Sequence, residues 1–230
     1  MPTKKTSRSL ATAPAAQPVE RSFGGELVRV EAVFRNPQIH HPKGSVWELE
    51  ADKVAWTDPL SGYACIILRD AKGKHLRGFV AVPPNHPFFQ RGLGTLVGYQ
   101  IGVHGGLDYA QPCQHTEPEY RSICHTQVRQ RQPEQIFANA AAAEGRDEAW
   151  WLGFSCNHPG DAWPGLLGDL ETNEPLPGLN AATYKDENYL YRECVRLAMQ
   201  LKAVEDGRHP SDADPGPTTD AYDPKDHGRG

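Results

Sequence analysis

The sequence predicts an α+β fold, in which an antiparallel sheet carries a C-terminal helix packed on one face. Residues 26–35 alternate apolar and polar side chains with a period of two, which is typical of a half-buried strand. Residues 63–70 and 76–83 flank a short connection at 71–74, as the two strands of a hairpin do. Residues 183–204 repeat their apolar side chains at helical spacing.

The helix over residues 183–204 is the most regular pattern in the chain. Its apolar residues step by four, three, four and three positions and form one stripe, with charged residues opposite. Thr183 and Asp186 have the spacing of an N-terminal cap. Because a helix with one apolar stripe usually packs on a sheet, this helix is expected to cover one face. The stripe consists of Leu190, Cys194, Leu197, Leu201 and Val204.

Three further segments are predicted to have regular structure. Residues 96–107 indicate a short strand that ends in a glycine pair, and the hydrophobic segment 148–156 indicates another strand. Residues 133–145 favour a helix, with Pro133 where a first-turn proline is tolerated and Gly145 at the C-terminal end.

One folded domain is expected at residues 23–204. The flanking segments 1–22 and 205–230 are rich in Ala, Pro, Gly and polar residues, and the second is acidic. Neither can bury enough apolar surface to offset the entropy lost on ordering, so both are predicted to be disordered tails. Within the domain, residues 113–146 are expected to be an insertion that includes the alanine-rich helix.

Composition argues against several classes of partner and reaction. The net charge is −5, so the chain lacks the basic surface that nucleic-acid binding requires. No apolar run approaches the roughly 18 residues of a membrane span, and the N-terminus lacks the apolar part of a signal peptide, so a cytoplasmic protein is expected. The sequence contains no GxGxxG, P-loop, GxSxG or HExxH motif, which argues against common nucleotide, esterase and metalloprotease sites.

The cysteines are predicted to be reduced thiols, because their number is odd and their contexts differ. They are Cys65, Cys113, Cys124, Cys156 and Cys194. One cluster combines two cysteines with His115 and His125, which would suit a small structural zinc loop. A polar surface insertion is the preferred interpretation, because the adjacent Cys124 and His125 point apart in an extended chain.

The segment "WWLGFSCNHPGD", residues 150–161, is the first candidate site. Side chains alternate along a strand, so Cys156 and His158 are expected on the same side, and the turn that follows would bring Asp161 beside them. Thiolate, imidazole and carboxylate are all zinc ligands. In the alternative interpretation, Cys156 is a small buried residue and Asp161 caps a backbone amide.

The segment "VHGGL" supplies a further histidine, His104, before two glycines that let the backbone approach a ligand closely. The predicted zinc site consists of His104, Cys156 and His158, with Asp161 as the fourth ligand or as the base for a metal-bound water. His104 and Asp161 are the predicted catalytic residues. His86, between prolines, is expected at the exit of a strand.

Four blocks of this sequence together resemble an uncharacterised family found in bacteria and their bacteriophages. They are "GFVAVPPNHPFF", "VHGGLDYA", "WWLGFSCNHPGD" and "YKDENYLYRECVRLAMQL", within residues 60–203. The resemblance implies that the signature positions are His86, His104, Cys156, His158, Asp161 and Glu193. Two features depart from the family. Ser155 stands where an acidic residue is common, and residues 111–147 form a longer connection between the second and third blocks than is usual.

Two functions follow from these patterns. The first is a metal-dependent, hydrolase-like enzyme acting on a small or nucleotide-like substrate, with a divalent metal such as zinc as its cofactor. The second is a non-enzymatic phage or mobile-element accessory protein that binds a small-molecule ligand or a host protein between the glycine loop and the "SCNHPGD" turn. Five Trp, eight Tyr and a negative domain would suit such a binding surface. A third alternative is a structural metal without any reaction.

Overall fold

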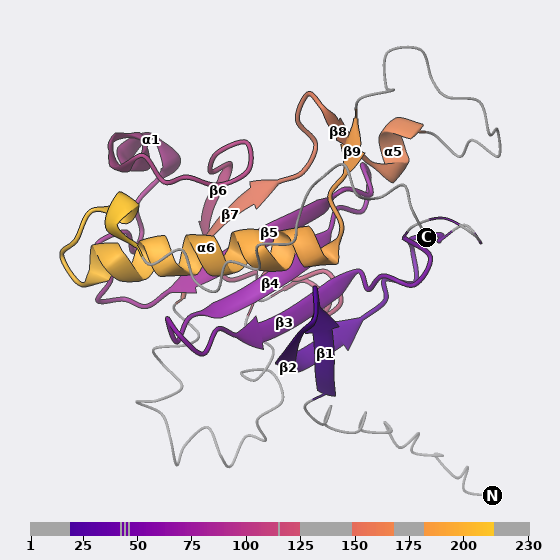
Figure 1. The fold of residues 1–230 in the computed structure, drawn as a ribbon, viewed down its shortest axis with the longest axis horizontal. Coiled ribbons are helices and arrows are strands. Elements are labelled where there is room, and N and C mark those ends of the chain that lie inside the picture. The colour runs from indigo at the N-terminus through magenta and orange to yellow at the C-terminus, as the bar shows by residue number, and fades with distance from the viewer. Residues whose placement is uncertain are drawn as a thin grey trace, which may run out of the picture.

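The chain forms a seven-stranded antiparallel sheet that one long helix crosses on one face (Figure 1). The strand order is β1-β2-β3-β4-β5-β7-β6. The predicted α+β fold is therefore confirmed. This computed structural model describes residues 19–41, 43, 45, 47–114, 116–124, 149–167 and 182–213. The helix predicted at 133–145 lies outside the described residues.

The first five strands form a meander. They are β1 (Val19–Phe23), β2 (Glu26–Phe34), β3 (Lys53–Thr57), β4 (Ala64–Arg69) and β5 (Leu76–Val82). β4 and β5 form the predicted hairpin. β7 (Trp150–Ser155) pairs with β5, and β6 (Tyr109–Pro112) pairs with β7 at the edge. β1 includes residues 19–22 of the expected tail, because Gly24 and Gly25 adopt the positive φ angles of a tight hairpin turn and pair it with β2.

A β-bulge in β2 changes which residues of this strand face the helix. The register between β2 and β3 shifts between Val30 and Ala32. Residues two positions apart normally share a face, yet Val30 packs in the core under the helix and Ala32 packs in the core on the opposite face.

The long helix, α6 (Glu187–Glu205), begins four residues later than predicted. Its N-cap is Asp186, whose side chain accepts a hydrogen bond from the Tyr189 N–H at 2.8 Å. The residues before it form the short strand β9 (Thr183–Tyr184), which pairs in parallel with β8 (Asp161–Ala162). The helix starts late because this pairing fixes the preceding backbone in an extended conformation.

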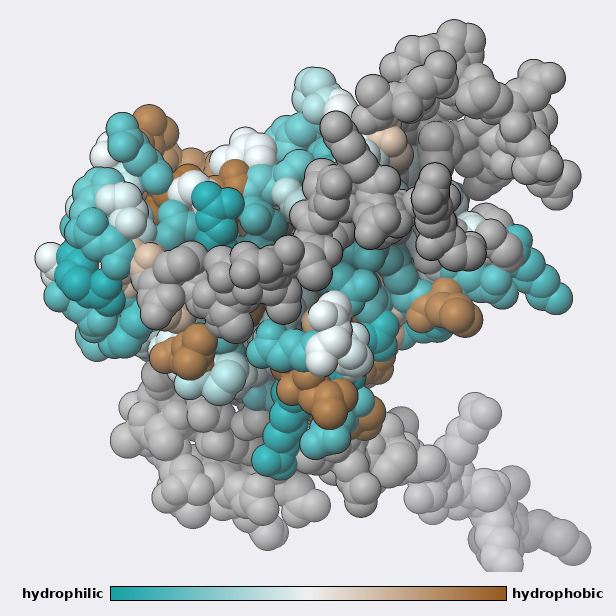
Figure 2. All heavy atoms as spheres, viewed as in Figure 1, coloured by the Kyte–Doolittle hydropathy of each residue, from teal (hydrophilic) through white to brown (hydrophobic). Residues whose placement is uncertain are grey.

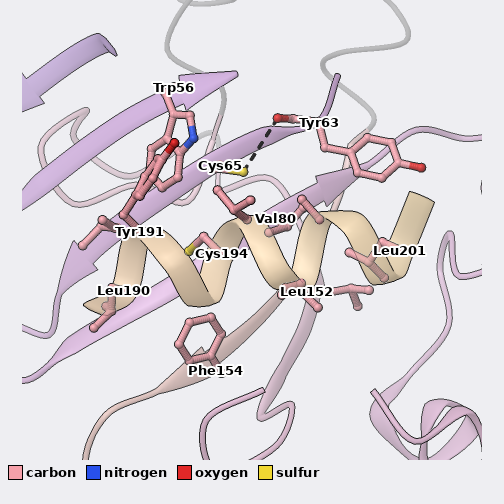
Figure 3. Packing of buried hydrophobic residues seen from close by; sticks show 14 of the residues in the cluster. Trp56, Tyr63, Cys65, Val80, Leu152, Phe154, Leu190, Tyr191, Cys194 and Leu201 are labelled. Carbon is pink, nitrogen blue, oxygen red and sulfur yellow. Dashed lines mark hydrogen bonds between the residues drawn. The ribbon is translucent and has the colours of Figure 1, made fainter. Parts of the chain in front are cut away.

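The predicted apolar stripe faces the sheet (Figure 3). Four of its residues are fully buried: Leu190, Cys194, Leu197 and Leu201. They pack against side chains of β5 and β7 that include Val80, Leu152 and Phe154. Gly78 in β5 permits this close packing, because a Cβ atom there would lie 2.7 Å from the Cys194 Sγ atom.

A disulfide between Cys113 and Cys124 closes a loop over the opposite face of the sheet. The prediction of reduced thiols is therefore wrong for this pair. The Gln114 N–H donates to the Ile123 carbonyl at 3.0 Å, which brings the two Cα atoms to 4.8 Å, within the usual range for a disulfide. The two sulfur atoms are bonded to each other, so they are not thiolates that could bind zinc. His115 and His125, the other two residues of this cluster, lie outside the described residues. The other three cysteines are free and buried.

Residues 96–107 do not form the predicted strand. They start in α1 (Leu93–Leu96) and η1 (Val97–Tyr99), and continue as an irregular loop. The side chain of Gln200 on α6 bonds to both backbone groups of Gly102, at 2.7 Å to the N–H and 2.9 Å to the carbonyl. The amide side chain thus satisfies the groups that a neighbouring strand would otherwise pair. We refer to residues 101–107 as the His104 loop.

Two short helices complete the elements: α5 (Pro164–Leu167) and η2 (Pro210–Asp212), the latter in the expected C-terminal tail. Across the ranges given above, no helix has both the length and the apolar content of a membrane span.

Candidate functional site

The turn after β7 brings Asp161 back to the end of that strand. The Asp161 N–H donates to the His158 carbonyl at 2.9 Å, and Gly160 adopts a positive φ of 95°. The Asp161 carboxylate in turn accepts the His158 N–H at 2.9 Å. Asp161 is 3% exposed, so the turn holds a buried carboxylate in a fixed position.

His104 connects this carboxylate to α6. Its Nε2 atom lies 2.8 Å from Asp161 Oδ2, and its Nδ1 atom lies 2.8 Å from the Tyr189 hydroxyl. Its backbone N–H donates to Glu193 Oε2 at 2.8 Å. In the neutral imidazole, Nε2 carries the proton toward the ionised Asp161 carboxylate, which can only accept, and Nδ1 is left to accept from the Tyr189 O–H. The imidazole can therefore act as a base, since the Asp161 carboxylate orients it and the Tyr189 hydroxyl lies within hydrogen-bond reach.

His158 lies beside His104, with 5.6 Å between the ring centroids. Its Nε2 atom is buried and has no hydrogen-bond partner among the described residues. The ring packs directly against Gly105, where φ is +66° and where an added Cβ atom would overlap Nε2. Gly105 is thus needed both for its backbone conformation and for the space that the His158 ring fills.

Cys156 lies under the site, in the core beneath α6, and is 2% exposed. Burial raises the pKa of its thiol well above the usual range, and the nearby charge of Asp161 acts in the same direction. Cys156 is therefore a neutral thiol in an apolar environment. This position matches the alternative interpretation, in which Cys156 is a small buried residue.

The four residues predicted as zinc ligands do not fit a metal ion in this arrangement. In the part of the chain that the structure describes, no three His, Cys, Asp or Glu side chains are placed to hold one. Both ring nitrogens of His104 have protein partners, and Cys156 is a neutral thiol whereas zinc binds the thiolate.

Lys185 and Tyr189 also belong to the site, although neither is predicted as a site residue from the sequence. The Lys185 Nζ atom lies 4.0 Å from Asp161 Oδ1 and 5.0 Å from the centre of the Tyr189 ring. One signal was present, because Tyr189 and Glu193 are four residues apart and so share one side of the helix. That side is the one that faces the His104 loop.

Ser155 lies on the other face of the sheet from Cys156. Its hydroxyl accepts a hydrogen bond from Arg77 Nε at 3.0 Å, and the side chain is buried. Because neighbouring strand residues point to opposite faces, the absence of a carboxylate at Ser155 does not affect the His104 and Asp161 cluster.

A second buried polar cluster, centred on Arg69, was also missed. Arg69 Nε bonds to Asp52 Oδ1 at 3.0 Å, and both residues are at most 2% exposed. The same guanidinium contacts Glu50 and the Tyr184 hydroxyl, while His41 contacts Asp52 at 3.0 Å. Burial opposes the charged guanidinium, but Tyr184 and Glu50 outweigh it and raise the pKa of Arg69. This cluster connects β4 to the segment before β3 and to the segment before α6.

His86 has a structural place away from the site. Its Nε2 atom donates to the Leu201 carbonyl at 2.9 Å, and its Nδ1 atom accepts the Phe88 N–H at 3.0 Å. The second bond requires a neutral imidazole, because Nδ1 can accept only when it carries no proton. His86 therefore holds the loop after β5 against the C-terminal half of α6.

Acidification is expected to destabilise the fold through His86. Burial lowers the pKa of His86 below its ordinary value of 6.5. The unfolded chain then binds the proton first, so the free energy of unfolding is intact above about pH 6.5 and falls as the pH drops toward the folded-state pKa. Burial also lowers the pKa of His75. The loss of unfolding free energy between pH 7.5 and pH 5.5, measured by urea unfolding, should be smaller for His86→Gln than for the wild type. Equal losses would contradict this role.

The structure thus places His104, His158 and Asp161 together, with Cys156 beneath them and Glu193 on the backbone of His104. The resemblance to a bacterial and phage family stays a prediction. In comparisons with known proteins, no protein-family model, no curated protein and no solved structure matches this chain.

Proposed function

We propose that the protein is a hydrolase-like enzyme in which Asp161, His104 and Tyr189 form a base-activated nucleophile. One observation carries the proposal: the His104 ring bridges a buried carboxylate and a hydroxyl, at 2.8 Å on each side. A nucleophile within hydrogen-bond reach of a base, itself oriented by a third group, is the geometry that nucleophilic catalysis requires.

The reaction would proceed in two steps. As the Tyr189 oxygen forms a bond to an acyl or phosphoryl centre, its proton passes to His104 Nδ1, and Asp161 stabilises the imidazolium. The bond to the leaving group breaks, and that group takes the proton from His104. Water then attacks the tyrosyl ester and gives a proton to His104, which returns it to the released Tyr189 oxygen.

Lys185 supports this chemistry through its charge. Its ammonium lies near Asp161 and over the Tyr189 ring, whose oxygen gains negative charge as it loses its proton and again as it is released. A small or nucleotide-like substrate with an ester or phosphoester bond suits such a site.

The test is hydrolysis of p-nitrophenyl acetate, p-nitrophenyl phosphate and bis-p-nitrophenyl phosphate. His104→Ala is expected to lower kcat/KM at least about a hundredfold on the substrate that the wild type turns over. Tyr189→Phe should abolish turnover, and Asp161→Asn should lower kcat. The matched control is His209→Ala, which removes an exposed histidine beyond the C-terminal end of α6, whereas Tyr189 lies near its N-terminal end. Two results would count against the proposal. One is equal turnover by the wild type and His104→Ala, and the other is no turnover of any of the three p-nitrophenyl substrates.

A second candidate is an accessory protein that binds a ligand or a host protein without catalysis. It is favoured by the fact that both ring nitrogens and the backbone N–H of His104 make internal bonds, as in a purely structural connection. In that case His104→Ala would lower the Tm and leave any slow hydrolysis unchanged. Mass spectrometry of proteins that co-purify from a bacterial lysate would then identify the partner.

A further inference from the structure

A cavity of about 260 Å³ opens beside the His104 loop, between this loop and the α1–η1 segment. Its side chains are mostly apolar, and the apolar ones are Leu93, Leu96, Val97, Ile101 and Leu107. A cavity of about 150 Å³ lined by such side chains already holds benzene. This cavity therefore has room for a substituted aromatic ring or an acyl chain of similar size.

Gly106 lines the cavity and is two residues from His104 in the same loop. It lines the cavity with bare backbone, at φ +86°, and no atom lies within 4 Å of a Cβ atom built on it. Consecutive Cα atoms are about 3.8 Å apart, so the Cα atoms of Gly106 and His104 lie within about 7.6 Å of each other. The preceding Gly105 packs against His158. The two glycines thus face different spaces, one toward the polar cluster and one toward the cavity.

The mouth of the cavity is also apolar. Val97, which lines the cavity, is 76% exposed. Figure 2 shows hydrophobic residues gathered on the surface over α1. Exposed apolar side chains around a concave site are typical of ligand-binding surfaces.

We propose that this cavity binds an uncharged apolar part of the substrate, an aryl or short acyl group, while the scissile bond lies at Tyr189. This inference rests on the proposed function. The lining contains no charged side chain among the described residues, and Gln100 supplies its polar side chain. A charged group would lose its hydration there without a partner, whereas an apolar group gains by leaving water.

Binding can be tested without any activity, with the neutral fluorophore N-phenyl-1-naphthylamine as the probe. The wild type is expected to enhance its fluorescence with a saturable Kd. Val97→Asp places a charge at the mouth and should raise this Kd at least about tenfold, an effect of about 1.4 kcal/mol. The matched control is Leu49→Asp, which makes a similar change at a residue that is 85% exposed and does not line the cavity. It should leave the Kd unchanged.

The substrate claim is tested by comparing p-nitrophenyl hexanoate with p-nitrophenyl acetate. Val97→Asp should raise KM for the hexanoate more than KM for the acetate, because only the hexanoate has an acyl chain long enough to fill the cavity. Absence of saturable probe binding, equal weakening by both aspartate variants, or unchanged KM for the hexanoate would overturn the inference. Failure of the proposed function looks different: the probe binds and responds to Val97→Asp, whereas His104→Ala leaves hydrolysis unaffected.

Discussion

Arg69→Ala is expected to destabilise the fold by about 3–5 kcal/mol, because it removes one partner of a buried ion pair and leaves the other charged. Asp52 is 1% exposed and would keep its carboxylate in the core without the guanidinium that lies 3.0 Å away. Glu50 and the Tyr184 hydroxyl would lose a partner as well. Urea unfolding at neutral pH, followed by tryptophan fluorescence, measures the loss.

Arg208→Ala is the matched control. Arg208 pairs with Asp206 at 3.3 Å, but both side chains are at least 40% exposed. Exposed pairs contribute about 0–1 kcal/mol, so the control should change stability little. A loss of less than about 1 kcal/mol for Arg69→Ala would mean that the cluster is hydrated in solution and does not hold the strands together.

Gly105→Val is expected to destabilise the fold by about 4 kcal/mol, from two causes. A β-branched residue at a φ of +66° is strained by about 1–3 kcal/mol. The added side chain also overlaps the His158 ring, and forced overpacking costs about 1–3 kcal/mol. The variant should also lose hydrolysis, because displacing His158 disturbs the turn that holds Asp161. The measurements are the urea midpoint and kcat/KM.

Gly106→Val separates the two causes. Gly106 has a similarly positive φ of +86°, but no atom lies within 4 Å of a Cβ atom placed on it. This variant should therefore show the backbone strain alone, about 2 kcal/mol. Equal destabilisation by the two variants would mean that the His158 ring does not pack against Gly105 in solution.

Local patterns were sufficient for much of the fold. The alternation in residues 26–35 predicted β2, and the stripe from Leu190 to Val204 predicted the face of α6 that packs on the sheet. Residues 96–107 also contain many apolar side chains but form a short helix and a loop, in which Gln200, from a distant part of the chain, satisfies both backbone groups of Gly102. The disulfide likewise depends on a loop that brings Cys113 and Cys124 together in space.

The candidate site was predictable only where its residues are close in sequence. The turn that returns Asp161 to His158 follows from local chemistry. The spacing of Tyr189 and Glu193 indicates a shared side of the helix, but only tertiary packing brings that side to His104. The burial of Cys156 was within reach of the sequence. Side chains alternate along a strand, so Cys156 points to the same face as Leu152 and Phe154. These two apolar residues indicate that this face belongs to the core.

The position of α6 has a consequence for how the protein is made. Among the described residues this helix is the last long element, yet it covers β4 and β5 and contacts the N-terminal hairpin, where the Gly24 N–H donates to Asn188 at 2.9 Å across 164 residues. During synthesis the strands leave the ribosome first, and their apolar face has no cover until residue 205 has emerged. Contacts so distant in sequence form slowly, and uncovered strands tend to associate with one another. The incomplete chain is therefore the form of this protein most exposed to aggregation.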